Sequence, residues 1–151
     1  MNNNPENSNN SIADILRVIL ILQQNACGDN SLDSCDRPCL GGGPNCLVCN
    51  TRPVMLYSCC GNGVPWSMPI SKDSNQVCSN PQVDSESIMC SNVFRVEKLD
   101  GNAATFRVLA PNLDKSCCNK QPYVGTNSFF TMDLSCCCCI RCLNDTYVDC
   151  V

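Results

Sequence analysis

The sequence predicts a mainly β fold: an antiparallel β-sandwich or barrel-like single domain with one N-terminal helix. Three observations lead to this prediction. Only one segment spaces its apolar residues as a helix does, six or more short segments after residue 50 have strand composition, and residues 93–110 read as a hairpin. With 151 residues, 44% of them hydrophobic, the chain is long enough to bury a core of its own.

The first fifty residues divide into three parts. Residues 1–10, MNNNPENSNN, predict a disordered polar arm. Residues 11–26 predict an amphipathic helix, because Ser11 can cap its start, with Asp14 three positions later, and Gly28 follows its end. Residues 27–50, rich in Gly, Pro, Asn and Asp, predict a cysteine-rich loop. The apolar face of the helix is expected to hold Ile12, Ile15, Leu16, Ile19 and Leu22, with Leu20 beside them.

Residues 51–151 are expected to form the β domain. Residues 54–60, VMLYSCC, predict a strand, and residues 64–70, VPWSMPI, predict a second one at a sheet edge because Pro65 and Pro69 cannot donate hydrogen bonds. Residues 71–89 read as a polar loop. Residues 128–135, SFFTMDLS, alternate as a strand that could continue into the cysteines that follow.

The hairpin at residues 93–110 has a predictable register. A two-residue turn at Asp100-Gly101 would set Phe94 opposite Arg107, whereas a three-residue loop ending at Asn102 pairs apolar with apolar residues. The hydrophobic pattern selects the longer loop, with Val96 opposite Phe106 and Phe94 opposite Val108. The other face then opposes Arg95 and Arg107, which is unfavourable unless a carboxylate such as Glu97 joins them; otherwise this face is an ordinary solvated one.

Residues 135–142 read SCCCCIRC, and their spacing limits how they can bond. Consecutive Cα atoms lie about 3.8 Å apart, and same-face neighbours on a strand about 6.5 Å apart, so neither suits a disulfide. If the run is a strand, Cys136 and Cys138 point to one face and Cys137 and Cys139 to the other. These thiols are therefore expected to bond elsewhere.

Seventeen cysteines exceed what one folded domain needs. Each intrachain bridge would add about 2 to 4 kcal/mol, so eight would exceed the roughly 5 to 15 kcal/mol of a typical domain. The surplus suggests bonds between chains, and the odd number leaves at least one cysteine free or joined to another molecule. Several buried and reduced cysteines are the plain alternative.

Composition also argues against several function classes. Ten basic and fourteen acidic residues give a net charge of −4 with no basic cluster, so no nucleic-acid partner is expected. The absence of histidine removes Ser/His and Cys/His catalysis and mixed Cys/His zinc sites. We predict no enzyme and no cofactor. One alternative is a Cys₄ zinc site from Cys46-x-x-Cys49 and Cys139-x-x-Cys142, although about ninety residues separate the two pairs.

The N-terminus lacks the positive region of a secretory signal, and the apolar stretch 18–22 is too short to span a bilayer. No membrane partner is expected. A cysteine-rich chain without an export signal is unusual, because cytosol keeps thiols reduced. Exposure to oxidation after synthesis would resolve the conflict, while a secreted disulfide-rich monomeric binding domain is the alternative.

Several stretches resemble the CotY/CotZ/ExsY family of Bacillus spore coat and exosporium proteins. They are NTRP at 50–53, VFRVE at 93–97, TFRVLA at 105–110 and MDLSCCCCIRCL at 132–143. The last is the most specific, and the family pattern maps onto Asp133, Leu134, Cys136, Cys138, Ile140, Cys142 and Leu143. Positions 137 and 139, Phe and Ala in the family pattern, are cysteine in this chain, and Cys59-Cys60 and Cys117-Cys118 are also additions.

The resemblance implies a structural role. Such proteins are made in the mother-cell cytoplasm without a signal peptide, reach the spore surface, and self-assemble into hexagonal, disulfide-cross-linked layers with themselves and other coat proteins. Residues 51–151 would be the self-assembly domain. The expected disulfide or cross-linking residues are Cys27, Cys35, Cys39, Cys46, Cys49, Cys136, Cys138, Cys142 and Cys150.

Overall fold

The computed structural model describes residues 11–24, 49–75, 77–78, 90–113, 121–149 and 151. It confirms a mainly β, antiparallel fold with one N-terminal helix. The predicted arm 1–10 and nearly all of the predicted loop 27–50 lie outside these residues. The elements are α1 Ser11–Gln24, β1 Val54–Ser58, β2 Met68–Pro69, β3 Cys90–Ser91, β4 Val93–Asp100, β5 Ala103–Pro111, β6 Tyr123–Asp133, a 3₁₀ turn Leu134–Cys136, and β7 Cys137–Cys142.

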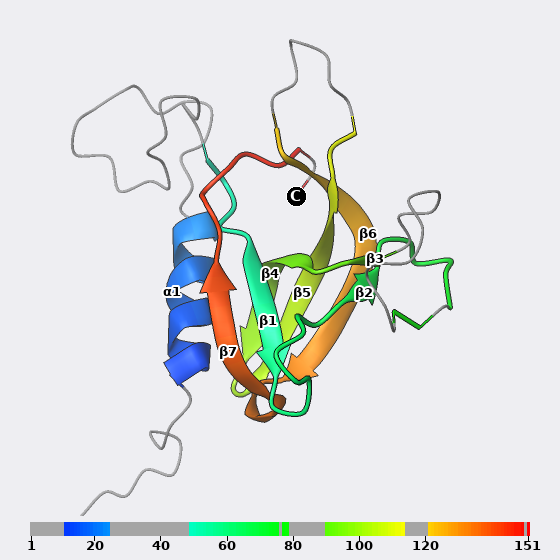
Figure 1. Cartoon of the computed structure of the whole chain (residues 1–151). Helices are drawn as coiled ribbons and strands as arrows, with labels where there is room; N and C mark the ends of the chain where they lie inside the picture. Colours follow the sequence, from blue (N-terminus) through cyan, green and yellow to red (C-terminus); the bar gives the residue numbers. More distant parts are fainter. Residues whose placement is uncertain (1–10, 25–48, 76, 79–89, 114–120, 150) are drawn as a thin grey trace, which may run out of the picture.

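Five strands form one antiparallel sheet in the order β6-β5-β4-β1-β7. The sheet curves, with β6 and β7 at its two edges, and α1 lies beside β7 (Figure 1). The short strands β2 and β3 form a second, two-stranded sheet. The C-terminal cysteine run therefore lies in an edge strand, next to the helix.

The main core fills the space between α1 and the face of the sheet that it covers. Phe94, Val96, Phe106 and Val108, the face predicted for the hairpin, are all fully buried there. Phe130 packs edge-on against Phe94, with ring centroids 4.7 Å apart, and stacks on Phe106 at 5.2 Å. Aromatic contacts of this kind add to the free energy gained from burial.

The buried face of the helix differs slightly from the predicted one. Ile12, Leu16 and Ile19 are buried as expected, but Ala13 is buried as well, and Ile15 is 42% exposed. The buried residues of the helix are centred on Leu16, which leaves Ile15 outside the buried stripe. Val18 and Ile21 also face outward, at 56% and 49% exposure. No helix among the described residues is long and apolar enough to cross a membrane.

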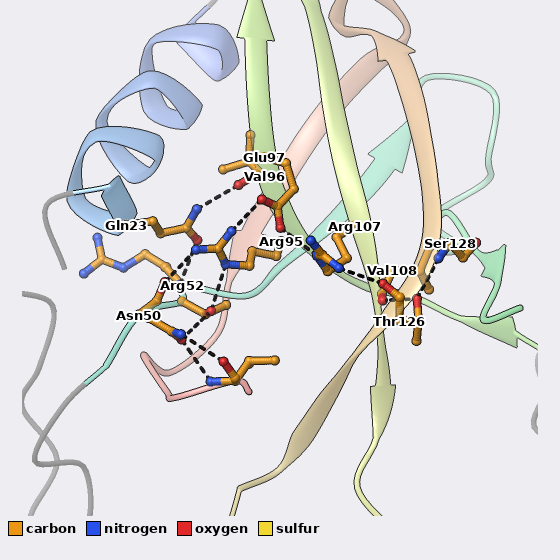
Figure 2. Close-up of polar contacts among 12 residues, drawn as sticks. Gln23, Asn50, Arg52, Arg95, Val96, Glu97, Arg107, Val108, Thr126 and Ser128 are labelled. Carbon is orange, nitrogen blue, oxygen red and sulfur yellow. Dashed lines mark hydrogen bonds and ion pairs between the residues drawn. The ribbon is translucent and has the colours of Figure 1, made fainter. Parts of the chain in front are cut away.

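The opposite face of the sheet carries a smaller core and a buried polar network. Val93, Leu109 and Val148 form the apolar part. The network centres on Arg95, which contacts the hydroxyl of Thr51 at 3.0 Å and forms an ion pair with Glu97 at 2.7 Å (Figure 2). Residues 49–53 and 144–148 run together over this face, joined by hydrogen bonds between Thr51 and Thr146.

The hairpin register is confirmed where it carries the core, with Val96 opposite Phe106 and Phe94 opposite Val108. The predicted three-residue loop is wrong. Asp100 pairs with Ala103 across a two-residue turn, and a bulge at Glu97 supplies the extra residue. Gly101 adopts a φ of 58°, a conformation that suits glycine.

The bulged Glu97 joins the two opposed arginines, as expected from the sequence. Its carboxylate lies 2.7 Å from Arg95 and 2.9 Å from Arg107. The alternative of a solvated face is wrong for Arg95, which is only 8% exposed. Figure 2 shows the chain of contacts running from Gln23 of α1, which donates to the Val96 carbonyl, through these residues to Thr126 of β6.

Two predicted strands differ from the structure. The segment 64–70 pairs only at Met68–Pro69, with an isolated bridge from Pro65 to Tyr57, because its prolines interrupt the ladder. The segment 128–135 belongs to the longer β6, which does not continue into the cysteines. It ends at Asp133, where the side chain accepts hydrogen bonds from Ser135 and caps the 3₁₀ turn. The chain reverses there, and β7 pairs with β1 instead.

Candidate functional site

The pairing of β7 with β1 decides where the thiols of the SCCCCIRC run lie. Leu56 opposes Ile140 and Tyr57 opposes Cys139, after which the register shifts so that Ser58 opposes Cys137. Two residues of β7, Cys137 and Cys138, therefore fill the interval that one residue of β1 occupies. This is a β-bulge, and it reverses the alternation of side chains along the strand.

Because of the bulge, the predicted alternation of the cysteine side chains between the two faces of the strand is wrong. Strict alternation would have turned Cys138 inward with Ile140, but Cys137 takes that place and is only 6% exposed, within the main core. Cys138 and Cys139 are both exposed. Whether residue 137 packs into a core was left open by the sequence, and in the structure it does.

Four exposed thiols gather at the end of β1 and the start of β7, and we call them the thiol cluster. Cys59 and Cys60 follow β1 directly, Cys136 closes the 3₁₀ turn, and Cys138 is in the bulge. The backbone N–H of Cys59 donates to the carbonyl of Cys136 at 3.0 Å, which holds the two segments together. The thiol of Cys138 lies 3.5 Å from the carbonyl oxygen of Tyr57, so it lies over the end of β1.

The surroundings of these thiols disfavour their ionised form. Partial desolvation and the nearby thiols of Cys138, Cys60 and Cys136 raise the pKa of the Cys59 thiol. Burial raises the pKa of the Cys137 thiol. A thiolate is the nucleophile in disulfide chemistry, so both groups react more slowly at neutral pH than an ordinary cysteine.

Cys142 lies at the other end of β7, apart from the thiol cluster. It borders a hollow of about 370 Å³ that is also lined by Tyr123, Arg141 and Asp145. Asp145 accepts two hydrogen bonds from Arg52, at 2.6 and 2.8 Å. Burial raises the pKa of the Cys142 thiol, and the positive charge of Arg52 opposes this effect.

The remaining cysteine candidates differ in state. Cys49 is buried and already forms a disulfide. Cys78 forms a disulfide with Cys90, the first residue of β3, a pairing for which the sequence carried no signal. Among the predicted linkers, Cys136, Cys138 and Cys142 are exposed and free. The others, Cys27, Cys35, Cys39, Cys46 and Cys150, lie outside the described residues.

The structure bears on the alternative Cys₄ zinc site through Cys49. Within the part of the chain that the structure describes, no group of three or more Cys, Asp or Glu residues could hold a metal ion. Cys49, a ligand of the alternative Cys₄ zinc site, is disulfide-bonded. A disulfide sulfur is not the thiolate that zinc binds, so Cys49 cannot serve as a ligand in this state.

Fold and site together define a cysteine-rich β protein. Its exposed free thiols, among the described residues, lie on the edge strand β7 and at the adjoining ends of β1 and the 3₁₀ turn, and its cores on both faces are packed. This class suits a structural role. A family model described as spore coat protein Z matches residues 1–145. The chain therefore belongs to the spore coat protein Z family, consistent with the resemblance of its C-terminal motif. No curated protein and no solved structure matches the chain.

Membership of this family makes the chain a structural protein of the spore coat. The family also implies that its partners are coat proteins and that it is located at the spore surface. A structural family also agrees with the expectation of a non-enzyme.

Proposed function

We propose that this protein self-assembles into a hexagonal lattice that disulfides cross-link, and that this lattice forms the exosporium or the outer coat or crust of the spore. The observation that carries the proposal is the exposure of the thiols. Of the seven free cysteines among the described residues, six are exposed and one is buried. Exposed thiols add little to a fold whose cores are already packed, whereas they can join neighbouring molecules.

The position of these thiols supports bonds between copies. Cys138, Cys139 and Cys142 lie on β7, an edge strand of the main sheet. A sheet edge presents backbone groups to which another chain can add. Packing of this edge against a neighbour would bring thiols of two molecules together before any covalent bond forms.

The outward face of α1 supports non-covalent association. Ile15, Val18 and Ile21 leave about half of each side chain exposed, and α1 packs against β4 and β7. Burial of apolar side chains stabilises association in proportion to the area removed from water. We propose that such contacts, with the charged pair of Asp14 and Arg17 at their margin, set the symmetry of the assembly and that oxidation then fixes it.

The proposed linkers are Cys136, Cys138 and Cys142, joined by the candidates outside the described residues. In this scheme the protein's partners are further copies of itself and other coat or exosporium proteins, with neither nucleic acid nor membrane. It has no catalytic role. Assembly follows the move from reducing mother-cell cytoplasm to the oxidising surface of the released spore.

Oxidation of purified protein tests the proposal. Protein prepared in reductant is oxidised, and its size is then measured by sedimentation and by gel electrophoresis without reductant. We expect high oligomers that reductant dissolves into monomers. The variant C136S/C142S should lose most of these covalent oligomers, whereas the matched variant C139S, which alters an exposed thiol outside the family pattern, should retain them.

A single compact monomer band after oxidation would contradict the proposal. It would favour the alternative of a monomeric disulfide-rich binding domain. Loss of fold on addition of a chelator, with release of stoichiometric metal, would favour the zinc alternative instead.

A further inference from the structure

Two segments that are far apart in the sequence come together at the end of the β1–β7 ladder, and each carries an exposed cysteine there. Cys59 follows the last residue of β1, and Cys138 lies in the bulge of β7. The Cys59 N–H bond to the Cys136 carbonyl extends the ladder one step beyond the bulge. The backbone thus holds both segments in place without any bond between the thiols.

The bulge turns the Cys138 side chain out of the core. Without it, Cys138 would oppose Ser58 and point inward with Ile140; with it, Cys137 points inward instead. The freed Cys138 side chain lies across β1, 3.5 Å from the Tyr57 carbonyl oxygen. Bulges commonly re-aim a side chain at the edge of a sheet.

We propose that Cys59 and Cys138 form an intrachain disulfide that fastens the edge strand β7 to the end of β1, closing when the protein meets an oxidant. Both thiols are exposed to solvent, the Cys138 thiol lies 3.5 Å from the carbonyl oxygen of Tyr57, two residues before Cys59, and the bond from the Cys59 N–H to the Cys136 carbonyl holds the two segments together. Cys60 cannot take the place of Cys138 as partner of Cys59, because adjacent residues are too close along the chain for ordinary disulfide geometry.

A low-molecular-weight disulfide is a sufficient oxidant. The Cys138 thiolate attacks one sulfur of that disulfide, which forms a mixed disulfide and releases the first small thiol. The Cys59 thiolate then displaces the second small thiol. In balance, two protein thiols lose two electrons and two protons to give one S–S bond, and the small disulfide gains them to become two thiols.

The bond would divide the thiols of this edge between two tasks. Cys138 and Cys59 would serve the chain itself, and Cys136 and Cys142 would remain for bonds to other molecules. This division rests on the proposed lattice, whereas the Cys59–Cys138 bond does not. It sharpens the set of proposed linkers by assigning Cys138 to an internal bond.

Disulfide mapping on the full chain tests the assignment. Reduced protein is oxidised with glutathione disulfide at high dilution, which suppresses bonds between molecules, and is then quenched in acid and alkylated. Chymotrypsin cuts after Tyr57, Trp66, Leu134 and Leu143, so the bond joins peptides 58–66 and 135–143 in the mass spectrum. We expect this joined peptide in wild type, its loss in C59S and in C138S, and its retention in the matched variants C60S and C136S.

The buried Cys137 reports whether each variant is folded, because it should resist alkylation before denaturation in every folded chain. Absence of the joined peptide from folded wild type, or its persistence in C138S, would overturn the assignment. The result is separable from the proposed function. A joined peptide without any lattice would refute the lattice alone, and a lattice without the joined peptide would refute the internal bond alone.

Discussion

Replacing Glu97 by Gln tests the buried polar network directly. The carboxylate lies between Arg95 and Arg107, whose side chains are only 10% and 16% exposed. Its loss leaves two opposed guanidinium groups without their shared counter-charge. Removing one partner of a buried ion pair costs about 3 to 5 kcal/mol.

Two features reduce that cost. The Glu97 side chain is itself 21% exposed, so solvent weakens the interaction. Arg95 also keeps its bond to Thr51 and Arg107 its bond to the Thr126 carbonyl. We therefore expect E97Q to lower the free energy of unfolding by about 2 to 3 kcal/mol.

Urea unfolding measures this change. With a denaturant slope of about 2 kcal/mol per molar, the midpoint should fall by about 1 to 1.5 M. The matched control is D14N, which makes the same chemical change in the exposed pair with Arg17 and should cost about 0.3 to 0.5 kcal/mol. All variants are compared in one fixed redox state. An E97Q midpoint shift no larger than that of D14N would refute the reasoning.

Three further outcomes are expected. F106A removes a fully buried ring that stacks on Phe130 and should cost about 3 to 5 kcal/mol in the same urea assay; a cost below that of D14N would contradict this packing. Under native conditions, N-ethylmaleimide should modify the exposed thiols while Cys137 stays unmodified until the protein unfolds, as followed by mass spectrometry; early modification of Cys137 would contradict its placement in the core. Hydrogen bonds from Ser135 hold the pKa of Asp133 below its usual range. A carboxyl whose pKa is lowered in the folded state stabilises the fold at pH values above its unfolded-state pKa of about 3.9. This stabilisation is lost as the pH falls through the folded-state pKa. D133N should therefore be less stable than wild type at neutral pH and equal to it in strong acid, and a difference that persists in acid would contradict this account.

The hairpin shows how much of the strand pairing the hydrophobic pattern can predict. Alternation of apolar residues placed Phe94 and Val96 against Val108 and Phe106, because a shift of one residue would have moved that set to the wrong face. The same pattern also identified the need for a carboxylate at Glu97. Its bulge was not predictable, because a two-residue turn plus one bulged residue produces the same core pairs as a three-residue loop.

The cysteine run shows where sequence patterns fail. Its pairing with β1 joins residues about eighty positions apart, and nothing in the local pattern of either segment specifies that contact. Strict alternation put Cys136 and Cys138 on one face and Cys137 and Cys139 on the other, but the bulge interrupts the alternation, so that Cys137 is buried and Cys138 and Cys139 are both exposed. The position of Cys138 over the end of β1 depends on both features, so it emerges only from the folded chain.

Electron microscopy of the oxidised protein tests the central claim of a cross-linked lattice most directly. The sample is purified in reductant, oxidised slowly, and imaged before and after reductant is returned. We predict ordered hexagonal sheets or rings that oxidation makes resistant to denaturant and that reductant makes sensitive again. Images that contain only monomers or disordered aggregates under oxidising conditions would contradict the claim.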